Sequence, residues 1–183
     1  MAFEQMGHQL TLLSGPVLET LYAWRLIGSA QTLATLGAYI EGHREEYGRS
    51  FLKNVESAAQ IGWRDYGAAY RMRTQFNEWL RDIFARFDLL FTPTLPTEAF
   101  GAAGPPPNEI DGRQLTDPME ALVFTYPFSL SGHPAASVRA GFTDNGLPCG
   151  LQIIAERHRD DLVLQAAYAF EQARPWNDCW PAI

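Results

Sequence analysis

The sequence predicts an α/β fold in which helices pack on a β-sheet, and three observations support that prediction. Apolar residues recur at helical spacing through most of the first half of the chain. One short apolar run at 89–92 and two longer runs, at 136–142 and 147–155, indicate strands. A last helical stretch begins at Asp160, where acidic side chains suit the start of a helix. Helices are therefore expected both before and after the strands, and the apolar segments on both sides of a long loop at 94–118 predict one shared core.

Three helices are predicted before the first strand. Ser14-Gly15-Pro16 is typical of a helix start, because proline has no N–H to leave unpaired in the first turn. This helix is expected to continue to Ile40 and to end at Gly42. A second, weaker helix is expected from about residue 44 to 60. The third has the clearest pattern, with one apolar face running from Tyr66 to Phe87.

The second half contains a strand, a long loop and a hairpin. The loop, residues 94–118, is rich in Gly and Pro, and loops of that length are commonly functional or mobile, although a linker is the alternative. Asn145-Gly146 favours positive φ at the centre of a tight turn and predicts a hairpin between the two longer strands. Pro148 cannot donate a ladder hydrogen bond, so the second strand should start at an edge or a bulge.

Composition excludes several classes of protein. The 183 residues carry 14 Lys and Arg against 21 Asp and Glu, a net charge of −7, which argues against nucleic acid as a partner. Lys53 is the only lysine and no apolar run approaches the roughly 20 residues of a membrane span, so no membrane association is expected. The first residues include an acid and no basic segment, unlike a secretory signal. With only Cys149 and Cys179, a reducing cytoplasmic location is expected.

The residues alone show no catalytic constellation. There is no Gly-x-Ser-x-Gly elbow, and Gly28-Ser29 lies inside the first predicted helix, where a packing role is the better interpretation. The four histidines are scattered, and of these only His133, in a turn, is expected near a pocket. We expect no metal site and, without a phosphate-binding glycine loop, no cofactor. Lys53 lies in an ordinary amphipathic stretch and is expected at the surface.

Several stretches, taken in order, resemble the carboxy-terminal part of the amidase signature family. The most specific is 124–155, which includes Pro-Phe-Ser-Leu-Ser-Gly-His-Pro and Asn-Gly-Leu-Pro-Cys-Gly-Leu-Gln. Asp88-Leu-Leu-Phe-Thr-Pro-Thr and the final stretch from Asp160 to Trp176 are similar to other family segments. Phe3-Glu-Gln-Met-Gly-His8 resembles a segment of bacterial amidases, including those that act on nylon oligomers. Together these stretches extend over nearly the whole chain.

The resemblance implies a mixed sheet between helix layers and hydrolysis of amide carbon–nitrogen bonds through an acyl-enzyme. The family's triad of Ser, cis-Ser and Lys lies upstream of the matched segments, and Lys53 matches no catalytic position. Residues 1–183 are therefore expected to be the C-terminal part of an amidase signature domain with the N-terminal catalytic half absent. No catalytic residue is carried over. Tyr126, Phe128 and Ser129 are expected to face the substrate, with the loop at 94–118 rimming the entrance.

Two functional interpretations follow. The chain could be the segment of an amidase that supplies sheet scaffold and pocket wall and is inert alone, or it could be a non-enzymatic truncated product or module that pairs with a separately encoded catalytic half. Ser129 stands where Asn is usual in the family. Leu122 and Asn54 stand where relatives that use glutamine carry an acid and an Arg, so a neutral or apolar amide is the expected substrate of the complete enzyme. Helix faces such as Leu80/Phe84/Phe87 are expected to lack a full partner and to favour self-association.

Overall fold

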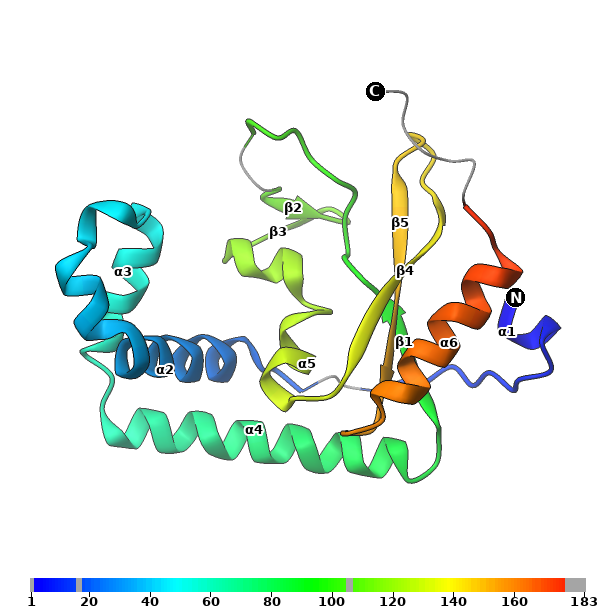
Figure 1. Cartoon of the computed structure of the whole chain (residues 1–183), viewed down its shortest axis with the longest axis horizontal. Coiled ribbons are helices and arrows are strands. Elements are labelled where there is room, and N and C mark those ends of the chain that lie inside the picture. The colour runs from blue at the N-terminus through cyan, green and yellow to red at the C-terminus, as the bar shows by residue number, and fades with distance from the viewer. Residues whose placement is uncertain (1, 16–17, 105–106, 177–183) are drawn as a thin grey trace.

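The computed structural model describes residues 2–15, 18–104 and 107–176 (Figure 1). Those residues form six α-helices, two 3-10 helices and five strands, which confirms the predicted α/β class. In chain order these are α1 (Ala2–Gln5), α2 (Leu21–Gly42), η1 (Arg44–Glu46), α3 (Arg49–Ala58), α4 (Trp63–Phe84), β1 (Leu89–Pro93), β2 (Glu109–Ile110), β3 (Arg113–Gln114), η2 (Pro118–Leu122), α5 (Tyr126–Ser131), β4 (Ala135–Phe142), β5 (Pro148–Ala155) and α6 (Asp160–Ala173).

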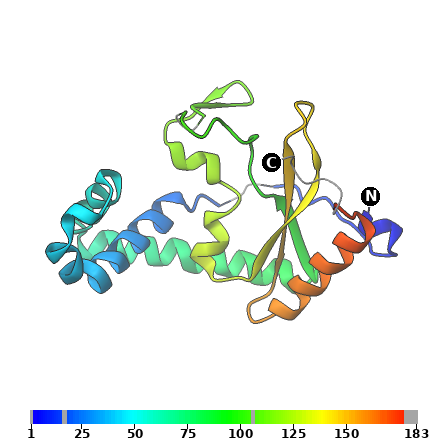
Figure 2. The ribbon, with the colours of Figure 1, turned by 45° about the horizontal axis from the view of Figure 1, so that its top comes forward.

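Strands β1, β5 and β4 form the main sheet in that order, and both pairings are antiparallel. The family resemblance implied a mixed sheet, which contains both parallel and antiparallel pairs. All the strand pairs among the described residues are antiparallel. Helix α6 lies on one face of the sheet, and α5 lies on the other, with α4 running beneath it (Figures 1 and 2). The sheet therefore separates two helical layers.

The predicted hairpin is confirmed. Phe142 pairs with Pro148 across the turn, and the ladder slips between Arg139 and Gly141, where a bulge lies. Strand β5 is central only where it pairs with β1, over Leu151–Ala155. Pro148 lies beyond that stretch, so its missing N–H leaves no gap in the β1 ladder, as the sequence predicted.

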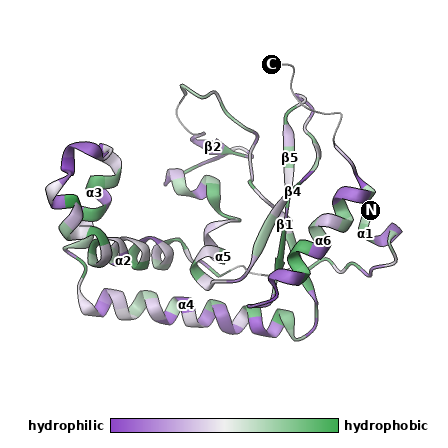
Figure 3. Ribbon diagram, in the orientation of Figure 1, coloured by the Kyte–Doolittle hydropathy of each residue, from purple (hydrophilic) through white to green (hydrophobic). Residues whose placement is uncertain are grey.

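The helical layer is built around α4, whose length carries alternating hydrophobic and hydrophilic residues (Figure 3). Ala69 on α4 packs with Ala23 and Ile27 of α2 and with Leu130 of α5. Leu80 is fully buried and belongs to the core against the sheet. Leu80 is therefore not part of an exposed face, because α5 and the strands cover it, whereas Phe84 and Phe87 are only half-buried.

Exposed apolar side chains lie elsewhere. Leu164 and Tyr168, four residues apart on α6, are 66% and 65% exposed. Trp63, at the start of α4, is exposed as well. Self-association through such exposed side chains stays a prediction. No helix within the described ranges is long and apolar enough to cross a bilayer.

Four local features differ from the expectations. The first helix begins at Leu21, whose N–H donates to the Glu19 carboxylate at 2.7 Å, and the predicted start at Pro16 lies outside the described residues. The second predicted helix is interrupted at Tyr47–Gly48, where the backbone is extended. The loop at 94–118 contains the small β2–β3 hairpin. The Pro-Phe-Ser-Leu-Ser segment, for which the sequence pattern predicted no helix, lies in helix α5.

Candidate functional site

Helix α5 carries the segment that the sequence predicted to face a substrate. Pro127 lies in its first turn, and the helix ends at Gly132, which adopts a left-handed φ of 73°. Arg157, after β5, donates from Nε to the Ser131 carbonyl at 2.9 Å and also donates from Nη2. This arginine therefore satisfies a carbonyl at the end of α5 and fixes the helix to the turn between β5 and α6.

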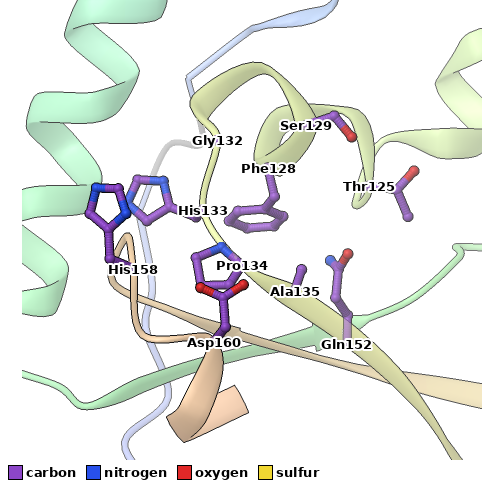
Figure 4. Close-up of a pocket in the computed structure, with 10 residues that line it drawn as sticks. All are labelled: Thr125, Phe128, Ser129, Gly132, His133, Pro134, Ala135, Gln152, His158 and Asp160. Atoms are coloured by element: carbon purple, nitrogen blue, oxygen red, sulfur yellow. The ribbon is translucent and has the colours of Figure 1, made fainter. Parts of the chain in front are cut away.

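A pocket of about 480 Å³ lies beside α5 and is shown in Figure 4. Its wall comes from α5 with the turn that follows it, the start of β4, strand β5, and the turn into α6. The lining residues are Thr125, Phe128, Ser129, Gly132, His133, Pro134, Ala135, Gln152, His158 and Asp160. The pocket thus combines an aromatic ring and small apolar groups with hydroxyl, amide and imidazole groups.

Gln152 organises the floor of this pocket, and it is a residue that the sequence analysis missed. Its side chain is buried in the middle of β5, and Nε2 donates to Thr92 Oγ1 at 2.8 Å and to the Phe124 carbonyl at 2.6 Å. These bonds link two strands to the chain just before α5. A single polar residue within the apolar run of β5 is the signal that could have identified it, because a buried amide needs partners.

His133 lines the pocket, as predicted, and is held from two sides. Its Nδ1 lies 2.9 Å from Ser131 Oγ, and its ring stacks on Phe84. Burial, with a smaller effect of the Arg157 charge, lowers the pKa of His133 to about 4, so the ring is neutral at neutral pH. Ser131 is itself buried and its hydroxyl donates to the Phe128 carbonyl at 3.2 Å. The Ser131–His133 pair therefore stabilises the end of α5, and Ser131 is not among the residues that line this pocket.

The structure places two of the three predicted substrate-facing residues at the pocket. Phe128 and Ser129 line it, with Ser129 exposed to solvent. Tyr126 instead packs against Trp24 of α2, with ring centroids 5.7 Å apart, and burial raises the pKa of its phenol to about 12. Its role in binding substrate stays a prediction. The expectation that His133 alone of the histidines lies near a pocket is wrong, because His158, although exposed, also lines it.

The other candidate groups lie away from the pocket. Lys53 is exposed on α3, and Ser29 lies within α2. None of the described residues of the loop at 94–118 lines the pocket. In this loop the Glu98 carboxylate accepts a hydrogen bond from Asn145 Nδ2, in the hairpin turn, at 2.8 Å. In the parts of the chain that the structure describes, no group of three or more His, Cys, Asp or Glu could hold a metal ion.

Comparisons with known proteins identify what this chain is similar to. The family profile described as Amidase matches residues 30–164. An acylamidase from Rhodococcus erythropolis is 31% identical over 99% of this chain and 38% of the relative. One subunit of the glutamyl-tRNA(Gln) amidotransferase from a Cyanothece strain is 35% identical over 81% of this chain and 30% of its own length. The chain therefore spans about a third of the curated relatives it matches.

Comparison with solved structures also finds enzymes that act on amides. A bacterial aryl acylamidase of the amidase signature enzymes superposes with a TM-score of 0.71 at 34% identity, over 85% of this chain and 34% of that one. A 6-aminohexanoate cyclic dimer hydrolase superposes with a TM-score of 0.70 at 25% identity, over 96% of this chain and 39% of the other.

Proposed function

This chain belongs to the amidase signature family, and on that premise we propose that it supplies the sheet scaffold and part of the substrate-pocket wall of an enzyme that hydrolyses the carbon–nitrogen bond of a neutral amide. The observation that supports this most directly is the pocket beside α5. It places Phe128 and Ser129 at one wall and an ordered, buried Gln152 at the floor.

The lining suits a neutral amide. An amide has a carbonyl acceptor and an N–H donor, and the hydroxyl of Ser129 can serve either group. Phe128 and Pro134 offer apolar contact to the acyl or amine substituent. Asp160 is the only carboxylate in the lining, and it disfavours an anionic substrate in this pocket. The proposed substrate class is therefore a neutral amide with an apolar substituent.

We further propose that the acyl-transfer groups come from residues other than these 183. The family resemblance assigns the base to a buried lysine, whereas Lys53, the only lysine in the sequence, is exposed on α3 and lines no described pocket. The catalytic groups then belong either to a longer chain or to a separate partner chain. Cys149 is a free, exposed thiol, which suits the reducing cytoplasm that we propose as the location.

A chimera tests the pocket proposal. The matching segment of the Rhodococcus erythropolis acylamidase is replaced by this chain, and hydrolysis of neutral anilides is measured. We expect activity, and we expect Ser129→Phe in the chimera to raise KM about tenfold by filling the pocket. Leu164→Ser, on the exposed face of α6, is the matched control and should leave KM unchanged. A folded chimera that binds and turns over anilides equally with and without Ser129→Phe would contradict the proposal.

The second test addresses the chain by itself. Purified protein is treated with a fluorophosphonate probe and assayed with the same anilides, beside an active amidase as the positive control. We expect neither labelling nor hydrolysis. Stoichiometric labelling of any serine in this chain would show that it carries its own nucleophile, and the proposed division of labour would then be wrong.

A further inference from the structure

A second pocket, of about 540 Å³, adjoins the first and shares Ser129, Gly132 and His158 with it. Its remaining wall comes from α2, α4, α5 and the turn after β5. These lining residues are Trp24, Ile27, Gly28, Gln31, Arg73, Leu130, Ser131 and Arg157. The volume lies in the range of pockets that bind small organic molecules.

The charge of this pocket is opposite to that of the chain. Arg73 and Arg157 both line it, and none of the lining residues is acidic, although the whole chain carries a net charge of −7. Five other arginines of the described segments form ion pairs with carboxylates, among them Arg25 with Asp117 and Arg159 with Asp161. Among the described residues, no carboxylate forms an ion pair with Arg73 or Arg157. The two guanidinium groups therefore create a local positive site that the protein itself does not neutralise.

Both arginines are held in place before any ligand arrives. Arg157 is fixed by its two hydrogen bonds to the Ser131 carbonyl. Arg73 lies over the ring of Tyr70, with its Cζ 4.2 Å from the ring centroid. A guanidinium has five N–H donors, so both groups keep donors for a further acceptor. Because their positions are already restricted, a ligand would lose little free energy in ordering them.

The pocket also has an apolar side. Trp24 and Ile27 of α2 line it together with Leu130 of α5. Gly28, next to Ile27 on α2, leaves space, since a Cβ built there meets no atom within 4 Å. A ligand that uses the whole pocket would therefore carry an anionic head and an apolar body.

We propose that this pocket binds an organic carboxylate, with the carboxylate between Arg73 and Arg157 and the apolar body against Trp24 and Ile27. Arginine suits this head group because its fork of donors matches the two oxygens of a carboxylate. A neutral amide would leave both charges unpaired, and an inorganic anion would leave the apolar wall unused. The proposal concerns binding by this chain and does not depend on amide hydrolysis.

Isothermal titration of the full chain tests the ligand class. Hexanoate, hexanamide and inorganic phosphate are compared at low and high salt. We expect hexanoate to bind about tenfold or more tightly than either comparison ligand, and its affinity to fall as salt screens the arginines. Equal binding of hexanamide would overturn the role of the charge, and equal binding of phosphate would overturn the organic carboxylate as the ligand.

Two variants that should keep the fold test whether hexanoate binds in this pocket. Arg73→Gln should weaken hexanoate about tenfold, whereas Arg71→Gln, exposed on the same helix and outside the pocket, should leave its affinity unchanged. Gly28→Leu should block the apolar side while preserving or raising the melting temperature, because leucine is a far better helix former than glycine. Wild-type affinity in both pocket variants would overturn the proposal. The anilide assay of the chimera is a separate readout, so failure here leaves the proposed function intact.

Discussion

The two faces of the main sheet are built from opposite kinds of residue. On the α6 face, Phe91 and Ile153 pack with Phe3 and Phe170 in a continuous apolar cluster, and the Phe3 and Phe91 rings lie 4.7 Å apart. On the α5 face, apolar packing is limited to one end, where Ile154 contacts Phe128. These two faces alternate residue by residue along the same strands, because successive side chains point to opposite sides.

Beyond Ile154, the α5 face is polar. Thr92, Gln152 and Ser137 are aligned across the three strands, and Thr94 Oγ1 lies 2.6 Å from Ser137 Oγ, above Gly150. The α5 face is held together by hydrogen bonds, which depend on precise geometry. The α6 face is instead stabilised by the burial of apolar surface. The comparison indicates that the α6 face provides stability and the α5 face positions the pocket.

The largest expected effect is on the α6 face. Phe170→Ala should lower the free energy of unfolding by about 3–5 kcal/mol, because it removes a buried ring from the cluster and leaves a cavity. Tyr168→Ala, two residues away on the same helix but largely exposed, should cost less than about 0.5 kcal/mol. Urea unfolding followed by circular dichroism measures both. Similar losses in the two variants would mean that α6 does not bury Phe170 as described.

A smaller loss of stability is expected on the α5 face, where the strands at Gly150 leave no room for a side chain. A Cβ at Gly150 would lie 2.5 Å from Thr94 Oγ1 and 2.8 Å from Ser137 Oγ, so Gly150→Ala should destabilise by about 2 kcal/mol. Gly141→Ala is the matched control in the same hairpin, since its Cβ would lie an ordinary 3.8 Å from Cys149 Sγ. Chemical denaturation measures the free energy of unfolding of both variants. If Gly150→Ala is as stable as Gly141→Ala, the close approach of side chains at Gly150 is contradicted.

The long helices and the longer strands could be predicted from the sequence, because each repeats its apolar pattern over many residues. The third helix and the Asn145-Gly146 hairpin followed from local physics, namely helical spacing and turn preference. The β2–β3 hairpin also had a local signal, Asp111-Gly112 between Ile110 and Arg113, which the loop-rich composition around it obscured. Short elements of two residues bury little, so their apolar pattern is too weak to detect.

The candidate site was less predictable, because it depends on contacts between residues distant in sequence. Helix α5 is only six residues long and is fixed by Arg157, 26 residues after Ser131. The amide of Gln152 reaches Thr92, 60 residues earlier. No local pattern encodes such partners. The family resemblance indicated Phe128 and Ser129, whereas no pattern in the sequence indicated that Arg73 and Arg157 line one pocket.

The least change in stability is expected from His133, whose contribution depends on pH. The pKa of His133 is lowered from an ordinary value of 6.5 to about 4, mainly by burial on the α5 face. Between these values the unfolded chain binds a proton that the folded chain does not, so His133 favours unfolding as pH falls from 6.5 towards 4 and has no such effect above 6.5. Because His133 is only partly buried, we expect a loss of about 1 kcal/mol between pH 7 and 4.5.

Comparison of variants isolates this contribution from those of other titrating groups. His133→Gln should show a shallower loss of stability than the wild type in urea unfolding between pH 7 and 4.5, because the variant has no imidazole to protonate. Glu120, whose pKa is lowered to about 2 by hydrogen bonds from Thr116 and Arg113, acts below this window and is the same in both proteins. His8→Gln, at an exposed position, should follow the wild type. If His133→Gln and His8→Gln give the same pH profile, then the α5 face does not keep His133 neutral, and the pocket is more open to water than its contacts indicate.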